Sequence, residues 1–239
     1  MSAPLFLVEG LPEGDMVVLD GPEGHHAADV QRLRPGEELL IGDGRGTLCQ
    51  AVVASVTKGR CSATITSRSY ERPPSPRLVV VQAIAKGDRG ELAVQAMTEI
   101  GVDVIVPWSA SRSVTQWRDE RGERARQRWC DTAREAAKQA RRAWVPEVTV
   151  AESTRTVAAR LRGGVVLHES AAEPLSTVDL PGDGDLAVVV GPEGGLAPEE
   201  LAAFAEAGGR AVRLGRSVLR TSTAGMAALA VLSVRLGRW

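Results

Sequence analysis

From residue 78 onward, short apolar runs typical of buried strands alternate with segments of helical periodicity. Strands are predicted at residues 78–84, 102–106, 164–168, 186–190 and 211–214, and helices at 91–100, 122–142, from 198 onward and at 222–235. Runs that are apolar on both faces need cover on both faces, so the alternation predicts an α/β domain with a parallel sheet between helices. Ligands of such sheets bind at the carboxyl ends of the strands, and the loops that follow the strands are therefore the candidate site.

The first 70 residues have a different pattern, in which short alternating or apolar runs are separated by Gly and Pro. These runs lie at residues 16–19, 38–41, 50–53 and 61–65, and they predict a small β-rich domain. Residues 70–77 then contain three prolines in eight positions, which neither a helix nor a central strand accepts. We therefore expect two domains, residues 1–72 and 73–239.

The chain contains three cysteines, Cys49, Cys61 and Cys130, which lie far apart and in no metal-ligand spacing. Their odd number argues against a disulfide framework and favours a reducing compartment. No run of about eighteen consecutive apolar residues occurs, and residues 1–6 lack the basic start of a secretory signal. We therefore expect a cytoplasmic protein without a membrane segment.

The net charge of −1 conceals an uneven distribution of charged residues. Residues 163–209 contain nine acids and no Lys or Arg, whereas residues 112–142 contain nine arginines and one lysine against five acids. Residues 58–77 form a second basic stretch. Arginine binds phosphate through paired planar donors and stacks on bases, so this distribution suggests a nucleic acid partner and a cofactor without phosphate. A solvated helix face would have the same composition, and charge alone does not decide between the two.

The loop after the predicted strand 186–190 reads Gly-Pro-Glu-Gly-Gly-Leu at positions 191–196. Glycines at a strand-to-helix turn let the backbone approach a ligand closely. The loop has neither the Lys and Ser or Thr of a phosphate-binding P-loop nor the G-x-G-x-x-G of a dinucleotide site. The one acid inside the loop, Glu193, and the two in the next turn, Glu199 and Glu200, suit a cation or a hydroxyl-rich ligand. The alternative is a tight turn in which a glutamate caps the next helix, and the residues of the loop taken alone slightly favour it.

Two further loops follow predicted strands. Residues 214–225 combine glycine, arginine and several hydroxyl side chains between the last strand and the last helix, where donors can converge on a planar heterocycle. Residues 168–170 read His-Glu-Ser after the strand that ends at Leu167. A lone histidine such as His168 is more often structural than catalytic.

These loops carry a resemblance to a known family. The motifs are GPEGGL at 191–196, LGRSVLRTSTAG at 214–225 and LHES at 167–170, supported by residues 25–46, 83–114 and 128–148. They resemble the SPOUT superfamily of S-adenosylmethionine-dependent RNA methyltransferases and, more narrowly, the RsmE family of 16S rRNA uridine-N3-methyltransferases. The similarity extends over essentially the whole chain in the same order.

The resemblance implies a PUA-like β-barrel at residues 1–72 that engages RNA. It implies a SPOUT methyltransferase domain at residues 73–239 whose parallel sheet is tied in a deep trefoil knot. Family members act as homodimers and need no metal. The implied reaction is methylation of N3 of uridine 1498 in 16S rRNA, either as free RNA or within the assembled small ribosomal subunit.

The resemblance also assigns residues to roles. The cofactor would contact Leu167, His168, Glu169, Gly191, Pro192, Glu193, Gly194, Gly195, Leu214, Gly215, Ser217, Val218, Leu219, Thr221, Thr223 and Ala224. RNA phosphates would be held by Arg32, Arg34, Arg134, Lys138, Arg141 and Arg142. Uridine N3 must lose a proton, so a base or nearby cations are needed. Arg220 and Arg112 are the candidates for stabilising the anion, and Glu193 either accepts the proton or binds the cofactor.

Two other functions stay open at this point. One is a SPOUT methyltransferase that acts on another rRNA or tRNA site, such as a ribose hydroxyl. The other is an RNA- or ribosome-binding protein that has kept the fold and lost catalysis. The second alternative predicts that no cofactor binds.

Overall fold

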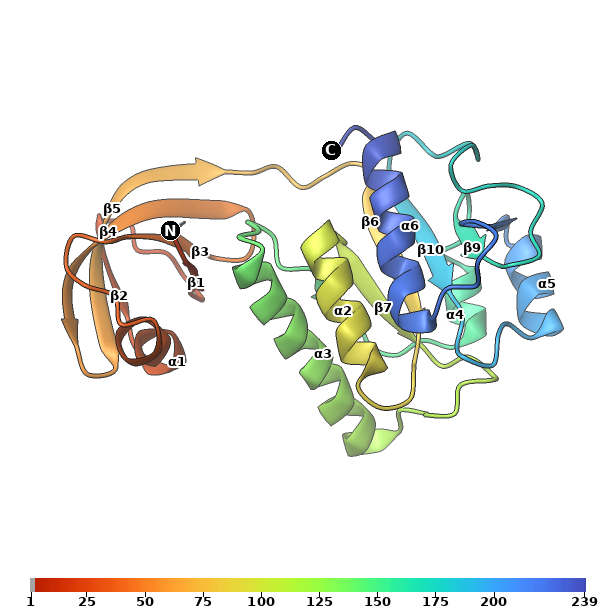
Figure 1. Ribbon diagram of the computed structural model, residues 1–239, viewed down its shortest axis with the longest axis horizontal. Coiled ribbons are helices and arrows are strands. Elements are labelled where there is room, and N and C mark those ends of the chain that lie inside the picture. Colours follow the sequence, from red (N-terminus) through yellow and green to blue (C-terminus); the bar gives the residue numbers. More distant parts are fainter. Residues whose placement is uncertain (1–2) are drawn as a thin grey trace. The chain divides into compact units, whose positions relative to one another are not determined.

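The computed structural model describes residues 3–239. The chain divides into two compact units, both drawn in Figure 1. The first unit comprises residues up to Pro73 together with Ala137–Val145, and the second comprises Pro74–Ala136 and Pro146–Trp239. The return of residues 137–145 to the first unit has no counterpart in the sequence pattern, because these residues continue a helical segment without a break in composition.

The first unit is built on a five-stranded sheet with the order β1-β3-β4-β5-β2. Its strands are β1 (Leu5–Leu7), β2 (Met16–Leu19), β3 (Glu38–Gly42), β4 (Thr47–Thr57) and β5 (Arg60–Tyr70), accompanied by the short helices α1 (Gly21–His25) and η1 (His26–Val30). Alternate residues of β4 and β5 are buried, as expected for strands with one face on a core. The four predicted runs are all strands, and β1 is an additional one.

Side-chain and backbone contacts attach residues 137–145 to this unit. The backbone N–H of Gly46 donates to the carbonyl of Ala143 at 3.0 Å, and the indole N–H of Trp144 donates to the carbonyl of Glu71 at 2.9 Å. Trp144 also makes an edge-to-face contact with Tyr70, with ring centroids 6.3 Å apart. These contacts explain why a segment distant in sequence packs with the N-terminal sheet.

The second unit contains a six-stranded parallel sheet with the order β11-β9-β10-β6-β7-β8. The strands are β6 (Arg77–Ala83), β7 (Val104–Trp108), β8 (Glu147–Val148), β9 (Val165–Leu167), β10 (Asp185–Val190) and β11 (Arg210–Val212). The chain runs outward from β6 to β8 on one side and then places β9, β10 and β11 on the other. This reversal beside β6 opens the carboxyl edge of the sheet, which is where such folds bind ligands.

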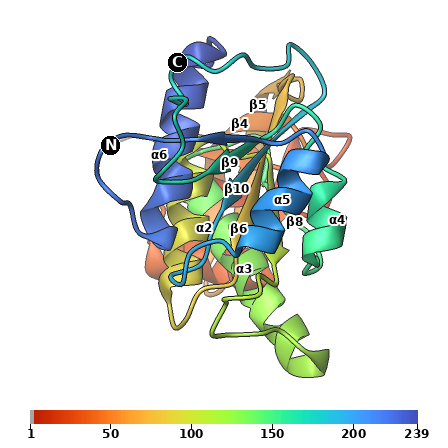
Figure 2. The ribbon, with the colours of Figure 1, turned by 90° about the vertical axis from the view of Figure 1, so that its right-hand side faces the viewer.

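Helices cover both faces of this sheet, as the apolar strands require. The side chains of Leu78 and Val80 pack with α2 (Arg89–Ile100), α3 (Asp119–Gln139) and α6 (Thr221–Arg235). The side chains of Val79 and Val81 face the other way, toward α4 (Thr154–Ala158) and α5 (Pro198–Glu206). Figure 2 shows α4 and α5 on the opposite side of the sheet from α2 and α6. The predicted α/β class with a parallel sheet is confirmed.

The long helix α3 differs from the prediction at both ends, since it begins at Asp119 rather than 122 and ends at Gln139 rather than 142. Its end is a Schellman motif in which Arg141 has a left-handed φ of +53°. The N–H of Arg141 donates to the carbonyl of Lys138 at 3.1 Å, and the N–H of Arg142 donates to the carbonyl of Ala137 at 2.9 Å. Glycine usually occupies the left-handed position, so its absence concealed this helix end.

Burial protects the three thiols, and this gives a first testable expectation. Cys49 and Cys61 are fully buried, Cys130 is half-buried, and burial raises the pKa of all three thiols above the ordinary value. Because the thiolate is the reactive form, we expect a thiol reagent near neutral pH to modify the folded protein roughly tenfold or more slowly than the denatured protein. Absorbance with Ellman's reagent measures both rates. Fast modification of Cys49 and Cys61 in the folded state would contradict the packing described here.

Candidate functional site

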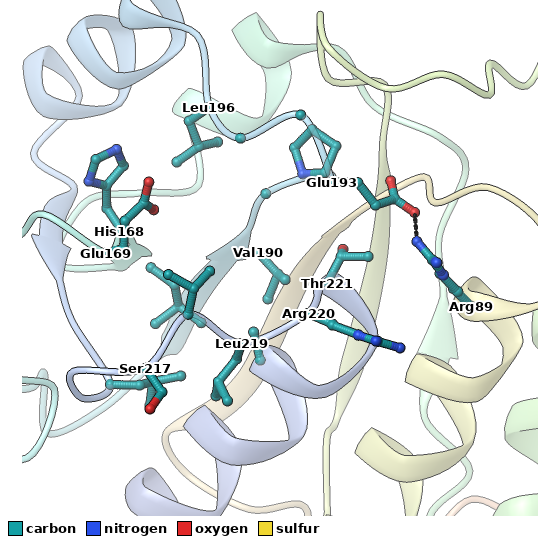
Figure 3. Close-up of a pocket in the computed structure, with 18 of the residues that line it drawn as sticks. Arg89, His168, Glu169, Val190, Glu193, Leu196, Ser217, Leu219, Arg220 and Thr221 are labelled. Carbon is teal, nitrogen blue, oxygen red and sulfur yellow. Dashed lines mark hydrogen bonds and ion pairs between the residues drawn. The ribbon is translucent and has the colours of Figure 1, made fainter.

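A cavity of about 550 Å³ lies at the carboxyl edge of the parallel sheet (Figure 3). It is formed by the ends of β9 and β10, the loop after β11 and the start of α6. Nearly all of the predicted cofactor residues line it, namely Leu167, His168, Glu169, Gly191, Pro192, Glu193, Gly194, Gly195, Leu214, Gly215, Ser217, Val218, Leu219, Thr221 and Ala224. Arg89, Val190, Leu196 and Arg220 complete the lining. The three loops chosen from the sequence therefore meet at one place.

The loop of residues 191–196 is a tight turn. The N–H of Gly195 donates to the carbonyl of Pro192 at 2.9 Å, and Gly195 has a φ of +71°, a conformation that glycine adopts without strain. A Cβ atom added to Gly194 would lie 3.1 Å from the Cβ and 3.2 Å from the carbonyl oxygen of Arg112. The glycines thus serve the turn itself and the close packing of residues 109–113 against it.

Glu200 caps the helix that follows this turn. Its Oε2 accepts a hydrogen bond from the N–H of Ala197 at 2.9 Å, and its Oε1 accepts from the N–H of Ser111 at 2.8 Å. The side chain is 3% exposed. The capping glutamate considered from the sequence is therefore present, and it is Glu200 on α5.

Glu193 faces the rim of the cavity and is ion-paired. Its Oε1 lies 3.2 Å from Nη1 of Arg89, the pair marked by the dashed line in Figure 3, and accepts from the N–H of Lys86 at 3.4 Å. Because these donors occupy Oε1, only the second carboxylate oxygen is left for a ligand. Arg89 was absent from the sequence prediction, although it closes the loop that follows the predicted strand 78–84, and loops after strands were the candidate site.

The loop after β11 supplies the apolar and cationic parts of the cavity wall. The side chains of Val218 and Leu219 are 76% and 40% exposed. The carbonyl of Arg220 accepts from the N–H groups of Thr223 and Ala224 at 3.0 and 2.9 Å and so begins α6. Among the described residues, the guanidinium of Arg220 has no hydrogen-bond or ion-pair partner. This cation is therefore available to a ligand.

Two threonines at the start of α6 have different environments. The hydroxyl of Thr221 accepts from Nε2 of Gln82 at 3.0 Å, and Gln82 is fully buried beneath the helix. Thr223, which was predicted to contact the cofactor, is not among the residues that line the cavity. Its hydroxyl donates to the carbonyl of Arg220 at 3.3 Å. Gln82 was not predicted, because a polar residue within an apolar strand gives no indication of what it will contact.

His168 stabilises its own turn. Its Nδ1 accepts from the N–H of Ser170 at 3.2 Å, and its backbone N–H donates to the carbonyl of Val212 at 2.9 Å. With Nδ1 as acceptor, the proton of the neutral ring is on Nε2. The structural role that the sequence favoured for this histidine agrees with these contacts, and the ring still forms part of the cavity wall opposite Arg220 (Figure 3).

Arg112 lies beside the cavity rather than in it. Its Nη1 donates to the carbonyl of Gly194 at 3.2 Å, and Arg112 is not among the lining residues. This geometry makes Arg112 a residue that positions the glycine loop. Within residues 3–239, no cluster of three or more His, Cys, Asp and Glu side chains has the arrangement of a metal site. No helix in the described part of the chain is long and apolar enough to cross a membrane.

The predicted phosphate-binding residues fall into different environments. Arg32, Arg34 and Arg141 are exposed, and Arg134 and Arg142 are half-buried. Lys138 is only 7% exposed, and its Nζ lies 3.0 Å from Oε1 of Glu23, which belongs to the same unit. A buried lysine that is already paired with a carboxylate is a poor ligand for RNA phosphate. The structure therefore argues against this role for Lys138.

Comparison with known proteins identifies the family. The RNA methyltransferase domain family matches residues 72–233, and the RNA methyltransferase PUA domain family matches residues 19–66. The chain belongs to the RNA methyltransferase family. The predicted enzyme class is thereby confirmed, together with a PUA domain in the N-terminal part of the chain.

Full-length relatives narrow the similarity within this family. The chain is 44% identical to ribosomal RNA small subunit methyltransferase E of Mycobacterium bovis. The aligned region covers 100% of this chain and 94% of the length of the relative. It is 30% identical to the Bacillus subtilis protein of the same name, over 93% of this chain and 91% of the relative. The predicted resemblance to the RsmE family is confirmed by these relatives.

Solved structures of similar proteins support the same family. The structure of ribosomal RNA small subunit methyltransferase E from Neisseria gonorrhoeae bound to S-adenosyl methionine has a TM-score of 0.88 at 29% identity and covers 98% of both chains. A methyltransferase from Legionella pneumophila in complex with the cofactor SAM has a TM-score of 0.87 at 26% identity, again with 98% of both chains covered.

Proposed function

We propose that this protein transfers a methyl group from S-adenosylmethionine to N3 of uridine 1498 in the 16S rRNA of the small ribosomal subunit. The observation that carries the proposal is the cavity at the carboxyl ends of β9 and β10, where a glycine turn with an acid and no lysine faces an apolar loop. Full-length similarity to ribosomal RNA small subunit methyltransferase E supports the choice of substrate.

The cavity has the chemistry that S-adenosylmethionine requires. Apolar surface for the adenine ring comes from five aliphatic side chains on the cavity wall: Leu167, Leu196, Leu214, Val218 and Leu219. The backbone of residues 191–195 and 214–219 provides donors and acceptors for the ribose and the amino acid part. The ligand carries a sulfonium cation and no phosphate, and the carboxylates of Glu169 and Glu193 are on the cavity wall while no lysine is. When bound, the cofactor supplies an electrophilic methyl group.

The side chains of this protein have to hold the uridine, remove the proton from its N3 atom and stabilise the resulting anion. Loss of this proton leaves a negative charge that spreads onto O2 and O4, and a preorganised cation lowers the cost of forming it. Arg220 lines the cavity and its guanidinium is not engaged, so we assign this stabilising role to Arg220. Arg112 positions the glycine loop through Gly194. Arg89 holds Oε1 of Glu193, and Oε2 of Glu193 is the candidate group on the cavity wall for accepting the N3 proton.

The proposal includes the finer features implied by the family. Residues 1–72 would form a PUA-like β-barrel that engages RNA, and residues 73–239 would form the methyltransferase domain with a deep trefoil knot. The protein would act as a homodimer in the cytoplasm, without a metal. The five-stranded sheet and the exposed Arg32 and Arg34, which lie in the connection between η1 and β3, are consistent with an RNA-binding domain.

A substitution at Arg32 is expected to affect RNA affinity and folding stability differently. It is exposed and has a left-handed φ of +55°, which glycine adopts more easily than arginine does. We expect Arg32→Gly to raise the free energy of unfolding by up to about 1 kcal/mol or leave it unchanged, because the strain relieved offsets the added freedom of the unfolded chain. The same variant should bind RNA several-fold more weakly with a smaller salt dependence.

Denaturant unfolding and filter binding at several salt concentrations measure the two effects of Arg32→Gly. Arg32→Lys is the matched control, because it keeps the charge and the strain and should preserve RNA affinity. An Arg32→Gly variant with the wild-type RNA affinity and salt dependence would remove Arg32 from the set of phosphate ligands.

Calorimetric titration with S-adenosylmethionine, followed by methyl transfer to RNA, tests the proposed function. We expect the purified protein to bind the cofactor and to transfer a labelled methyl group to free 16S rRNA or to isolated small subunits. The two substrates are assayed in parallel, so the experiment also identifies the assembly state that the enzyme accepts. A protein that binds RNA but not the cofactor would contradict the proposal and support an RNA-binding protein without catalysis.

A further inference from the structure

A second cavity, of about 800 Å³, lies at the carboxyl ends of β6 and β7. None of its residues was assigned to a site individually, although Arg121, Arg124 and Arg128 belong to the basic stretch of residues 112–142. Its lining comes from the loop after β6, the start of α2, the loop after β7 and the first three turns of α3. The lining residues are Ala85, Gly87, Gly90, Glu91, Val114, Thr115, Gln116, Trp117, Arg121, Arg124, Ala125, Arg128 and Trp129. All of these residues belong to the second unit.

Three arginines dominate the charge of this cavity. Arg121, Arg124 and Arg128 are spaced three and four residues apart on α3 and therefore lie along one side of the helix. Among the described residues, the side chain of Arg121 has no hydrogen-bond or ion-pair partner. Arg124 lies 3.2 Å from Oε2 of Glu120, and Arg128 lies 3.3 Å from Oε1 of Glu91. The Arg124–Glu120 pair is exposed and contributes little to stability, so a phosphate can displace this carboxylate. The guanidinium of Arg128 is itself exposed beside the half-buried Glu91.

An indole forms the apolar part of the wall. Trp117 packs edge-to-face on the buried Trp129, with ring centroids 4.8 Å apart. The absence of a side chain at Gly122 permits this placement, because a Cβ atom there would lie 2.8 Å from the carbonyl carbon of Trp117. A fixed aromatic ring beside several guanidinium groups is the combination that binds the bases and phosphates of unpaired RNA.

The second cavity adjoins the first. The segment after β6 contributes Arg89 to the wall of the first cavity and Gly87 and Gly90 to the wall of the second. The loop after β7 contributes Val114 to the second cavity, and its Arg112 is hydrogen-bonded to Gly194 of the first at 3.2 Å. Both cavities open at the same edge of one parallel sheet. A polymer bound in the second cavity is thus held next to the methyl donor's site.

We propose that the second cavity binds the substrate RNA strand beside the nucleotide that is methylated. Arg121, Arg124 and Arg128 hold phosphates of the flanking nucleotides, and the ring of Trp117 packs against a neighbouring base. This inference rests on the proposed function and adds an RNA-binding site to it. It also adds phosphate-binding residues in the second unit to Arg32 and Arg34 of the first unit.

Charge reversal at Arg121 tests this site. Arg121→Glu is compared with Arg155→Glu, which makes the same change at an exposed arginine of α4 that lines neither cavity. The probe is a synthetic RNA oligonucleotide that carries the target uridine and its flanking sequence. We expect Arg121→Glu to weaken RNA binding about tenfold at moderate salt and to lower the slope of log K against log salt by about 0.7 for each phosphate that is no longer neutralised. Affinity for S-adenosylmethionine, measured by calorimetry, should stay at the wild-type value.

The outcomes distinguish this inference from the proposed function. If Arg121→Glu and Arg155→Glu have the same RNA affinity and salt slope, the second cavity is not an RNA site. An equal loss of cofactor affinity and RNA affinity in Arg121→Glu would also contradict the proposed RNA site. So would an acidic peptide that binds the wild type but not Arg121→Glu, if RNA binds neither protein. If the wild type transfers no methyl group to any RNA, the proposed function fails and this inference fails with it. Both variants have exposed substitutions, and their thermal unfolding verifies that each is folded.

Discussion

Gly194→Val is expected to lower the affinity for S-adenosylmethionine by roughly ten- to a hundredfold while leaving RNA affinity unchanged. The added Cβ would lie 3.1 and 3.2 Å from the Cβ and the carbonyl oxygen of Arg112, and one of these is backbone that cannot move aside freely. Overpacking of this kind costs about 1–3 kcal/mol, which corresponds to the expected change when it distorts the cofactor-binding turn. Calorimetry with S-adenosylmethionine measures the loss.

Gly182→Val is the matched control for this variant. Gly182 is exposed, and a Cβ atom added there would have no neighbour within 4 Å, so cofactor affinity should not change. Wild-type cofactor affinity in Gly194→Val would contradict the assignment of residues 191–196 to the cofactor site. Equal losses in both variants would indicate that general destabilisation, rather than the turn, is responsible.

Arg220→Ala is expected to reduce kcat by about 10²- to 10³-fold, the range observed when one preorganised donor to a developing anion is removed. The backbone of Arg220 begins α6, and alanine can keep this backbone conformation. The affinity for S-adenosylmethionine should therefore change little, and the loss should be in kcat. Single-turnover methyl transfer with saturating cofactor and RNA measures it.

Arg216→Ala is the control from the same loop. Arg216 is exposed and does not line the cavity, so its replacement removes the same charge without removing a group that faces the ligand. If the two alanine variants have equal rates, the proposed role of Arg220 is wrong. Partial recovery of kcat in Arg220→Lys would support a requirement for positive charge at this position.

The parallel sheet could be predicted because its central strands are apolar at nearly every position. In β6 and β10 every residue after the first is buried. A short run that is apolar at nearly every position is typical of a central strand with both faces covered. The short elements β1, β8 and α4 were not predicted. Each contains only two to five residues, too few to establish a period, and each is fixed by contacts with distant parts of the chain.

The candidate site was predictable to the extent that its residues follow strands. Residues 167–169, 191–196 and 214–221 all lie directly after strands that the pattern identified, and parallel pairing brings these ends to one edge. Arg89, Gln82 and Glu200 were not given their roles, because each depends on a partner far away in sequence: Glu193, Thr221 and Ser111. The pairing of Lys138 with Glu23, which argues against its predicted role as a phosphate ligand, is likewise visible only in the fold.

The most direct test of the proposed reaction is mass spectrometry of 16S rRNA after the enzyme has acted on it. Small subunits from a strain that lacks this methyltransferase are incubated with the purified protein and S-adenosylmethionine, and both nucleosides and ribonuclease fragments are analysed. We predict N3-methyluridine, located in the fragment that contains uridine 1498. A methyl group on another base or on a ribose hydroxyl would contradict the proposed reaction, and an unmodified RNA with no cofactor bound to the protein would contradict catalysis altogether.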